Sequence, residues 1–332
     1  MGEFRDTLAK RIIREQWCKP LIKYVHDKLK YKLLYLGLPG PQALDLDNWI
    51  EYFDEIIAFQ CRDYPNPSSI RQNNADVLGL NNKLREFERR GKIRTYSLYD
   101  GYIEEVILRG KDVSGNIFSQ NDVVTVYNLD FCNSITQPLK VNEENGNVRD
   151  YYKTEVIRRL LEFQREISTN GKIKKFVMFF TVHTNFLHGE GTRYIAQTRD
   201  RDLKRYFYAI RGLRFREKNV RLLRAYIFHI IREFFCNCEF TPEFLPAIFY
   251  QGYGSAHENW LIHQTIIGAL NKQKSARAPH FQDTNIFLNR CFLTPRDGKL
   301  DNLKLGIINE NECRVDSVQS FSESECFQRL WR

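Results

Sequence analysis

Short apolar runs alternate along this chain with longer segments in which apolar residues recur at helical spacing. The runs lie at 32–37, 55–60, 93–99, 123–126 and 175–183. The helical segments between them lie at 44–53, 70–90 and 151–168. Runs of this length suit buried strands, and the amphipathic segments suit helical crossovers between parallel strands. The order predicts an α/β fold, with a mainly parallel sheet and helices on both of its faces.

The last third of the chain predicts a different pattern. Two further strands, at 244–250 and 260–267, are separated by a glycine-rich stretch typical of a hairpin or long turn. We expect three regions: an N-terminal helical cap at 1–30, broken at Pro20, an α/β domain at 31–270, and a C-terminal extension at 271–332. A basic helical insertion at 199–236 precedes the last strand pair, and 136–150 is expected to be a long polar loop.

The most polar strand end follows the apolar run at 123–126. Asn128, Asp130 and Phe131 lie there within four residues. In open α/β sheets, ligands bind beyond the carboxyl ends of the strands, so this stretch is a candidate reaction centre. The alternative is an ordinary turn, because Asn and Asp side chains readily form local hydrogen bonds.

Three other strand ends carry residues suited to a nucleotide-like ligand. Gly37 and Gly40 follow the first strand, and glycine lets the backbone approach a ligand closely. Gln60 and Asp63 follow the second strand, where an acid commonly accepts hydrogen bonds from ribose hydroxyls. Asp100 follows the third.

The positive charge of the chain is concentrated. The net charge is +9, with a pI of about 9.1, and residues 199–233 contain eleven basic and four acidic residues. Such a region favours a polyanionic partner, although a solvated helix surface has the same composition. The candidate nucleic-acid-binding residues are Arg205, Arg211, Arg214, Lys218, Arg221 and Arg224.

Several classes of protein lack support in the sequence. The eight cysteines include no CxxC pair, only the CxC of Cys236 and Cys238, so no metal site is predicted. No P-loop or HExxH motif and no Ser-His-Asp order is present. No apolar run approaches 18 residues and the first residues are polar, so we expect a cytoplasmic protein without a transmembrane segment.

The order of elements over residues 30–270 resembles that of class I S-adenosylmethionine-dependent methyltransferases. The resemblance implies a Rossmann-like, seven-stranded sheet whose last two strands form a hairpin, with one strand antiparallel. It also implies S-adenosylmethionine as cofactor. The glycine loop would hold the methionine part, Gln60 or Asp63 the ribose, and Asp100 the adenine. Asn128 or Asp130 would orient an exocyclic amine, and Phe131 or Tyr127 would stack against its base.

Some positions depart from that family's pattern. Tyr35 stands where strand one usually carries an acid, and the two prolines of the strand-four motif are missing. We therefore hold two hypotheses. The chain is a transferase that methylates a nucleic-acid or other polyanionic substrate. Alternatively, it is a catalytically degenerate methyltransferase fold that serves as a nucleic-acid- or protein-binding subunit of a larger bacterial complex.

Overall fold

The computed structural model describes residues 6–30, 32–60, 70–131, 134–142, 146–168, 175–184, 204, 215–251, 260–270, 292–296 and 299–302. Five parallel strands form the centre of its sheet, in the order β3-β2-β1-β4-β7. They are β1 (Leu33–Gly37), β2 (Phe53–Gln60), β3 (Thr95–Asp100), β4 (Val126–Asp130) and β7 (Lys175–His183). The chain runs outward from β1 to β3 and then returns to the other side of β1 at β4. The switch point, where such folds bind ligands, therefore lies between β1 and β4.

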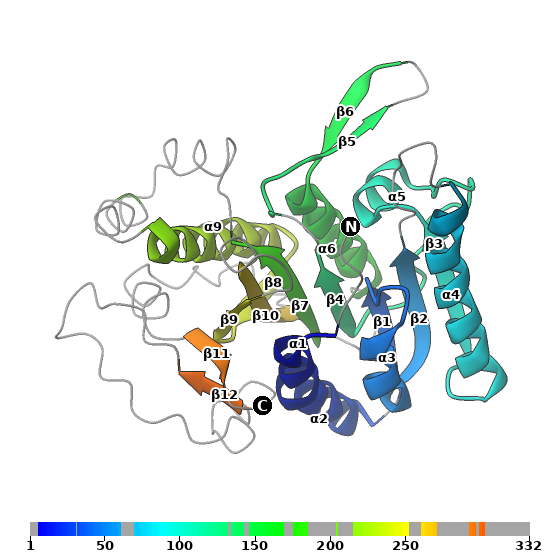
Figure 1. The fold of residues 1–332 in the computed structure, drawn as a ribbon, viewed down its shortest axis with the longest axis horizontal. Coiled ribbons are helices and arrows are strands. Elements are labelled where there is room, and N and C mark those ends of the chain that lie inside the picture. The colour runs from blue at the N-terminus through cyan, green and yellow to red at the C-terminus, as the bar shows by residue number, and fades with distance from the viewer. Residues whose placement is uncertain are drawn as a thin grey trace.

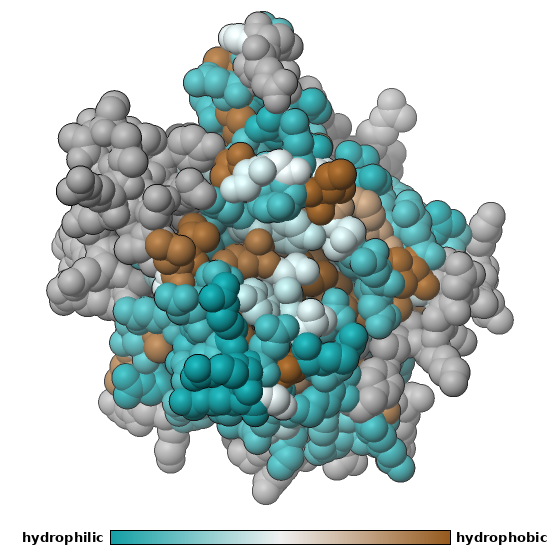
Figure 2. All heavy atoms as spheres, turned by 90° about the vertical axis from the view of Figure 1, so that its right-hand side faces the viewer, coloured by the Kyte–Doolittle hydropathy of each residue, from teal (hydrophilic) through white to brown (hydrophobic). Residues whose placement is uncertain are grey.

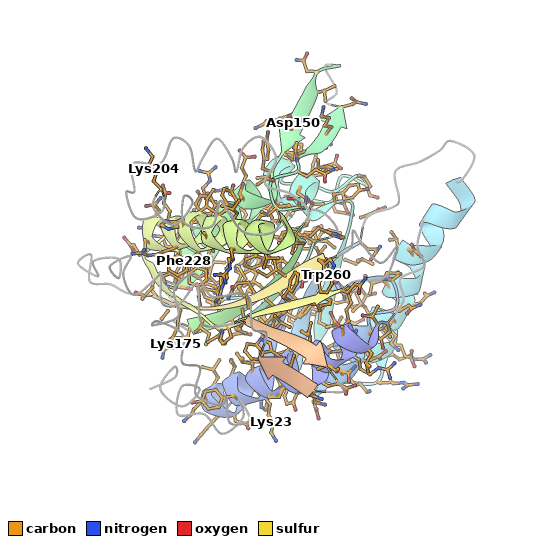
Figure 3. The ribbon with its side chains drawn as sticks, turned by 60° about the vertical axis from the view of Figure 1, so that its left-hand side comes forward. Lys23, Asp150, Lys175, Lys204, Phe228 and Trp260 are labelled. Atoms are coloured by element: carbon orange, nitrogen blue, oxygen red, sulfur yellow. The ribbon has the colours of Figure 1, made fainter. Side chains whose placement is uncertain are left out.

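Antiparallel strands continue the sheet beyond β7. β10 (Trp260–Leu270) runs antiparallel to β7, and its outer edge pairs with β8 (Phe240–Phe244) and β9 (Ala247–Gln251). Figure 3 shows the result, with Trp260 at the start of β10 and Lys175 at the start of β7, at opposite ends of the pair. The predicted α/β fold class is confirmed by this topology, including the antiparallel strand next to the fifth.

The C-terminal extension contributes to the same sheet. β11 (Phe292–Arg296) pairs in parallel with β9, and β12 (Lys299–Asn302) pairs with β11. The sheet thus has ten strands in the described part of the chain. The domain boundary proposed at residue 270 therefore does not separate the extension from the sheet.

Helices cover the two faces of the sheet and divide the apolar core in two. One face packs against α5 (Ile103–Arg109), α6 (Lys153–Ser168) and α9 (Phe215–Asn237). The other packs against the N-terminal helices, α3 (Leu44–Trp49), the 3-10 turn η2 (Ile50–Tyr52) and α4 (Ile70–Arg89). Figure 1 shows α4 beside the edge of the sheet formed by β2 and β3.

The N-terminal cap is one continuous helix. It comprises α1 (Leu8–Ile12), the π-helical segment η1 (Ile13–Cys18) and α2 (Lys19–Leu29), and the backbone stays right-handed helical at both junctions. The predicted break at Pro20 is wrong, because Pro20 lies in the first turn of α2 and follows the wider π turn. There the Lys19 N–H donates to the Arg14 carbonyl, five residues back.

The stretch expected to be a polar loop at 136–150 contains an antiparallel hairpin. β5 (Leu139–Asn142) pairs with β6 (Val148–Tyr151), and the hairpin projects from the body of the fold (Figure 1). Figure 2 shows the adjoining face, where hydrophilic residues surround small groups of apolar ones. The loop prediction failed because the alternation of Leu139 and Val141 with polar residues is too short to stand out.

A buried amide fixes the start of β4 against α6. Gln164 is fully buried, and its Oε1 accepts hydrogen bonds from the Tyr127 hydroxyl (2.9 Å) and the Val124 N–H (3.1 Å). Its Nε2 donates to the Val124 carbonyl at 2.8 Å. Tyr127 is thereby committed to the core rather than to a ligand.

Gly37 allows β1 and β4 to approach closely at their carboxyl ends. The Leu38 N–H donates to the Asn128 carbonyl oxygen at 2.9 Å. A Cβ on Gly37 would overlap that same oxygen and lie 2.8 Å from the Tyr35 hydroxyl. The glycine is therefore required by the packing of the sheet.

We predict that Gly37→Ala lowers the free energy of unfolding by about 3 kcal/mol or more, because the overlap is with backbone that cannot move aside. Gly79→Ala on α4 is the matched control, since its Cβ would meet only the Pro41 carbonyl at 3.8 Å. The control should gain about 0.5–1 kcal/mol from helix propensity. Denaturant unfolding of both variants gives the comparison, and equal stabilities would contradict the prediction.

Candidate functional site

A pocket opens at the carboxyl ends of β1 to β4. Its cavity volume is about 120 Å³, and its walls come from the turn after β1, the ends of β2, β3 and β4, and the base of the hairpin. It is lined by Leu38, Gly40, Phe59, Gln60, Gly101, Tyr102, Ile103, Glu104, Asp130, Phe131, Pro138, Leu139 and Lys153. We call it the strand-end pocket. Four of the predicted site residues meet there: Gly40, Gln60, Asp130 and Phe131.

The other predicted cofactor residues do not line this pocket. Gly37 faces the backbone of β4, and Asp63 lies outside the described residues. Asp100 is only 6% exposed, and its N–H donates to the Asp112 carboxylate at 3.2 Å. Its neighbours Gly101 and Tyr102 form the wall instead. The adenine role predicted for Asp100 stays a prediction.

Residues at the end of β4 alternate between the two faces of the sheet, as in any strand. Phe131 is 2% exposed and joins the core beside α6, with the Lys153 ammonium 5.9 Å from the centre of its ring. Asn128 and Asp130 point to the opposite face, toward the N-terminal helix. The strand thus separates an apolar side from a polar one.

A buried ion pair closes the apolar side of the strand-end pocket. The Lys153 ammonium lies 3.3 Å from the Glu104 carboxylate, and both side chains are less than a tenth exposed. Lys153 also donates to the Gln137 carbonyl at 3.2 Å. This pair holds α6 to α5 beneath the pocket, because separating two buried charges is costly.

Two cations of the N-terminal helix pair with acids on the polar side. Lys10 Nζ lies 2.6 Å from Asp130 Oδ2, and Arg14 Nε donates to Asp45 Oδ1 at 2.5 Å. Asn128 Nδ2 donates to Asp45 Oδ2 at 2.9 Å and to the Tyr35 hydroxyl at 3.2 Å. Burial opposes the charge of Lys10, but Asp130, Tyr250 and Asp45 together outweigh it and raise the pKa of Lys10 above its usual value.

Beneath the helix lies a second, smaller cavity, which we call the polar cavity. Its volume is about 40 Å³, enough for a water molecule with several polar partners. It is lined by Lys10, Ile13, Arg14, Cys18, Asp45, Trp49, Asn128, Asp130, Thr181, Tyr250 and His263. Asp130 lines both cavities, so the polar cavity and the strand-end pocket meet at this residue.

His263 on β10 is a buried part of the polar cavity. It is 4% exposed, with Nδ1 3.0 Å from the Thr181 hydroxyl and Nε2 3.7 Å from the Cys18 sulfur. Burial lowers the pKa of His263 to about 4, so the imidazole is neutral near pH 7. These contacts make His263 a hydrogen-bonded residue of the core.

We predict that His263 makes the protein less stable in acid. Unfolded His binds a proton below pH 6.5, whereas folded His263 stays neutral down to about pH 4. Stability is therefore lost as pH falls through this window, by about 3 kcal/mol in total. Denaturant unfolding at pH 7, 5.5 and 4 should show a shallower loss in His263→Gln than in the wild type. His26→Gln, at a partly exposed position on α2, is the control; an unchanged slope in His263→Gln would refute the prediction.

Two of the basic side chains predicted to lie on the surface of α9 are buried. Arg221 and Arg224 are each 1% exposed, so the expectation that they contact a nucleic acid at the surface is wrong for this arrangement. The prediction was wrong because α9 is enclosed on more than its apolar side. Helical periodicity does not reveal this. Arg205, Arg211 and Arg214 lie outside the described residues, as does the side chain of Lys218.

The residues that the structure describes contain neither a metal-ligand cluster nor a candidate membrane span. No group of three or more His, Cys, Asp or Glu side chains there is placed to hold a metal ion. None of the described helices combines the length and apolarity needed to cross a bilayer.

The residues that sequence reasoning missed are those of the N-terminal helix and its partner on α3. Lys10 lies 120 positions from Asp130, and Arg14 lies 31 positions from Asp45. Nothing in the sequence pairs these charges. The closest signal is the polar pattern at the end of β4, which places Asn128 and Asp130 on one face and so requires a polar neighbour there.

No protein-family model and no curated protein matches the chain. Among solved structures it is similar to magnesium protoporphyrin IX methyltransferase from Synechocystis PCC 6803 with bound SAM. The two are 10% identical over 80% of this chain and 86% of that one, with a TM-score of 0.35. P. horikoshii TYW2 in complex with MeSAdo is 9% identical over 81% and 65%, with a TM-score of 0.37. Precorrin-6y C5,15-methyltransferase from Geobacter metallireducens GS-15 is 8% identical over 75% and 86%, with a TM-score of 0.30. Similarity this low assigns no activity, and the fold rests on the strand order described above.

Proposed function

We propose that this protein is a methyltransferase that binds S-adenosylmethionine in the strand-end pocket. The single observation that carries the proposal is the position of that pocket. It lies at the switch point between β1 and β4, and Asp130 reaches it from the end of β4. In sheets of this order, ligands bind at that position.

The residues of the pocket suit part of such a cofactor. Gly40 has a φ of +69° and presents no side chain, and the Gln60 amide can hydrogen-bond a hydroxyl. Leu38, Phe59 and Ile103 supply apolar surface. Sites for ligands of drug size commonly measure about 300–1,000 Å³, so a cavity of about 120 Å³ holds one part of the cofactor.

Three bulky residues near the end of β1 and on α3 lie away from this pocket. Tyr35 and Trp49 are both buried on the face covered by the N-terminal helix, not in the pocket. Pro39 lines neither cavity wall described above. An open pocket supports the enzyme over a scaffold that has lost its cofactor.

We predict that S-adenosylmethionine binds the purified protein, releasing heat in a calorimetric titration and raising the Tm. Gln60→Ala should weaken binding roughly tenfold, as expected for the loss of one hydrogen bond. Gln251→Ala, at the exposed end of β9, is the matched control and should bind like the wild type. Neither heat nor a Tm shift at millimolar cofactor would overturn the proposal.

The proposed substrate is a nucleic acid or another polyanion, supported by the net charge of +9 and its concentration in residues 199–233. The buried positions of Arg221 and Arg224 leave the remaining basic residues of that region to carry the contact. Binding to a polyanion would precede methyl transfer and would not require the cofactor.

We predict that wild-type protein binds random-sequence RNA with an affinity that falls steeply as salt increases, because phosphate contacts release counterions. Arg214→Glu with Lys218→Glu should weaken binding and reduce the slope of log K against log salt by about two. Arg85→Glu with Arg89→Glu on α4 is the control of equal charge change. If both double variants lose affinity equally, residues 199–233 hold no specific site. RNA binding without cofactor binding would favour the scaffold hypothesis.

A further inference from the structure

The space next to Asp130 is already occupied by an amine of the chain itself. Lys10 Nζ lies 2.6 Å from Asp130 Oδ2, with the two side chains 27% and 23% exposed. Asp130 borders the strand-end pocket, the polar cavity and a third cavity of about 30 Å³ at the mouth between α1 and the turn after β1. Any group that approaches a cofactor from this side must pass the position that the Lys10 ammonium holds.

The surroundings of Lys10 select a nitrogen that carries protons. Asp130 and Asp45 offer carboxylate oxygens, and Thr181 and Tyr250 offer hydroxyl oxygens around the same cavity. The cations that balance the carboxylates, Lys10 and Arg14, both come from the N-terminal helix. The sheet side of the cavity thus carries acceptors and acids, and the cations that balance them belong to a separate element. Such a cavity suits an amine ligand.

The element that carries Lys10 is weakly anchored. Within α1 only Ile12 is buried, whereas Leu8 is 63% exposed. The segment that follows is held much more firmly. Arg14 is paired with Asp45, and the Trp17 indole donates to the Thr265 hydroxyl at 2.8 Å. The first turns can therefore move while η1 and α2 stay in place.

We propose that the position beside Asp130 is an acceptor site for a primary amine, and that Lys10 fills it in cis until an external amine displaces it. This rests on the proposed methyltransferase function. The group that accepts the methyl is then a primary amine, whichever polymer carries that amine. The aromatic side chains predicted to stack a base do not face this position, because Tyr127 and Phe131 belong to the core on the other face of β4.

The transfer balances with the cofactor named above. The bound ammonium loses one proton to water, which frees the nitrogen lone pair, while Asp130 accepts a hydrogen bond from a remaining N–H group and orients the amine. S-adenosylmethionine held in part by the strand-end pocket would supply the methyl group, and its carbon–sulfur bond would break as the nitrogen bonds the methyl carbon. The products would be a methylated amine and a neutral thioether.

Chemical rescue tests the site without the cofactor. Lys10→Ala leaves Asp130 without its counter-ion and should lower the Tm by several degrees. Millimolar n-butylammonium should restore the Tm of Lys10→Ala, while butan-1-ol, of similar size but uncharged, should not. The double variant Lys10→Ala with Asp130→Asn should not respond to either. Lys23→Ala, at an exposed position on α2, is the control for loss of a lysine from the same helix.

The wild-type chain provides a second measurement should Lys10→Ala not fold. Butylammonium at high concentration should speed hydrogen exchange at residues 8–12 and leave α2 unchanged. The proposal would be overturned if butylammonium neither restored the Tm of Lys10→Ala nor changed hydrogen exchange in the wild type. It would also be overturned if butan-1-ol restored the Tm as well, or if adenosine alone restored it. Rescue by butylammonium, with no methylated amine formed when S-adenosylmethionine is added, would support the amine site and refute the methyltransferase function instead.

Discussion

The arrangement of the site depends on one set of polar contacts between the N-terminal helix and the sheet. Arg14 reaches Asp45, and Asp45 in turn accepts from Asn128 at the end of β4. The Arg14 side chain is only 7% exposed and pairs with both Asp45 and Asp6, so these two carboxylates compensate a guanidinium that has little access to water. Removing one partner of a buried pair costs about 3–5 kcal/mol, and for loss of Asp45 the contact with Asp6 offsets part of that cost. This contact keeps α3, the helix and β4 in register, and so sets where Asp130 lies.

The two sides of β4 serve different purposes, and the sheet makes that possible. Tyr127 and Phe131 belong to the apolar core, where Gln164 accepts a hydrogen bond from the buried Tyr127 hydroxyl. Asn128 and Asp130 face a polar layer built from the N-terminal helix, β7 and β10. A short strand with alternating chemistry thus joins a rigid interior to an ionised surface. The pocket forms where that alternation reaches the end of the strand.

Much of this arrangement follows from the sequence, and the remainder has a physical reason for not doing so. The apolar runs and the amphipathic segments between them predict the parallel strands, and Gly252–Asn259 predicts the return to β10. Gly37 was assigned to a ligand, but its need for space comes from Asn128 across the sheet. Local patterns report which face of an element is buried. They do not report which distant charge will meet Asp130, since Lys10 is an ordinary lysine on an ordinary helix.

The hydrogen bond from Trp17 to Thr265 spans 248 positions of the chain. During synthesis the first strands leave the ribosome long before β10 does, and domains fold from the N-terminal end as they emerge. The helix at 8–29 can pack early against α3, where the Trp49 indole donates to the Arg14 carbonyl, but the contact of Trp17 with β10 must wait until most of the chain has been made. Contacts that close so large a loop form slowly. The nascent protein thus passes through a stage in which Asp130 and the helix that covers it are already made, while the side of the polar cavity that carries Tyr250 and His263 is still missing.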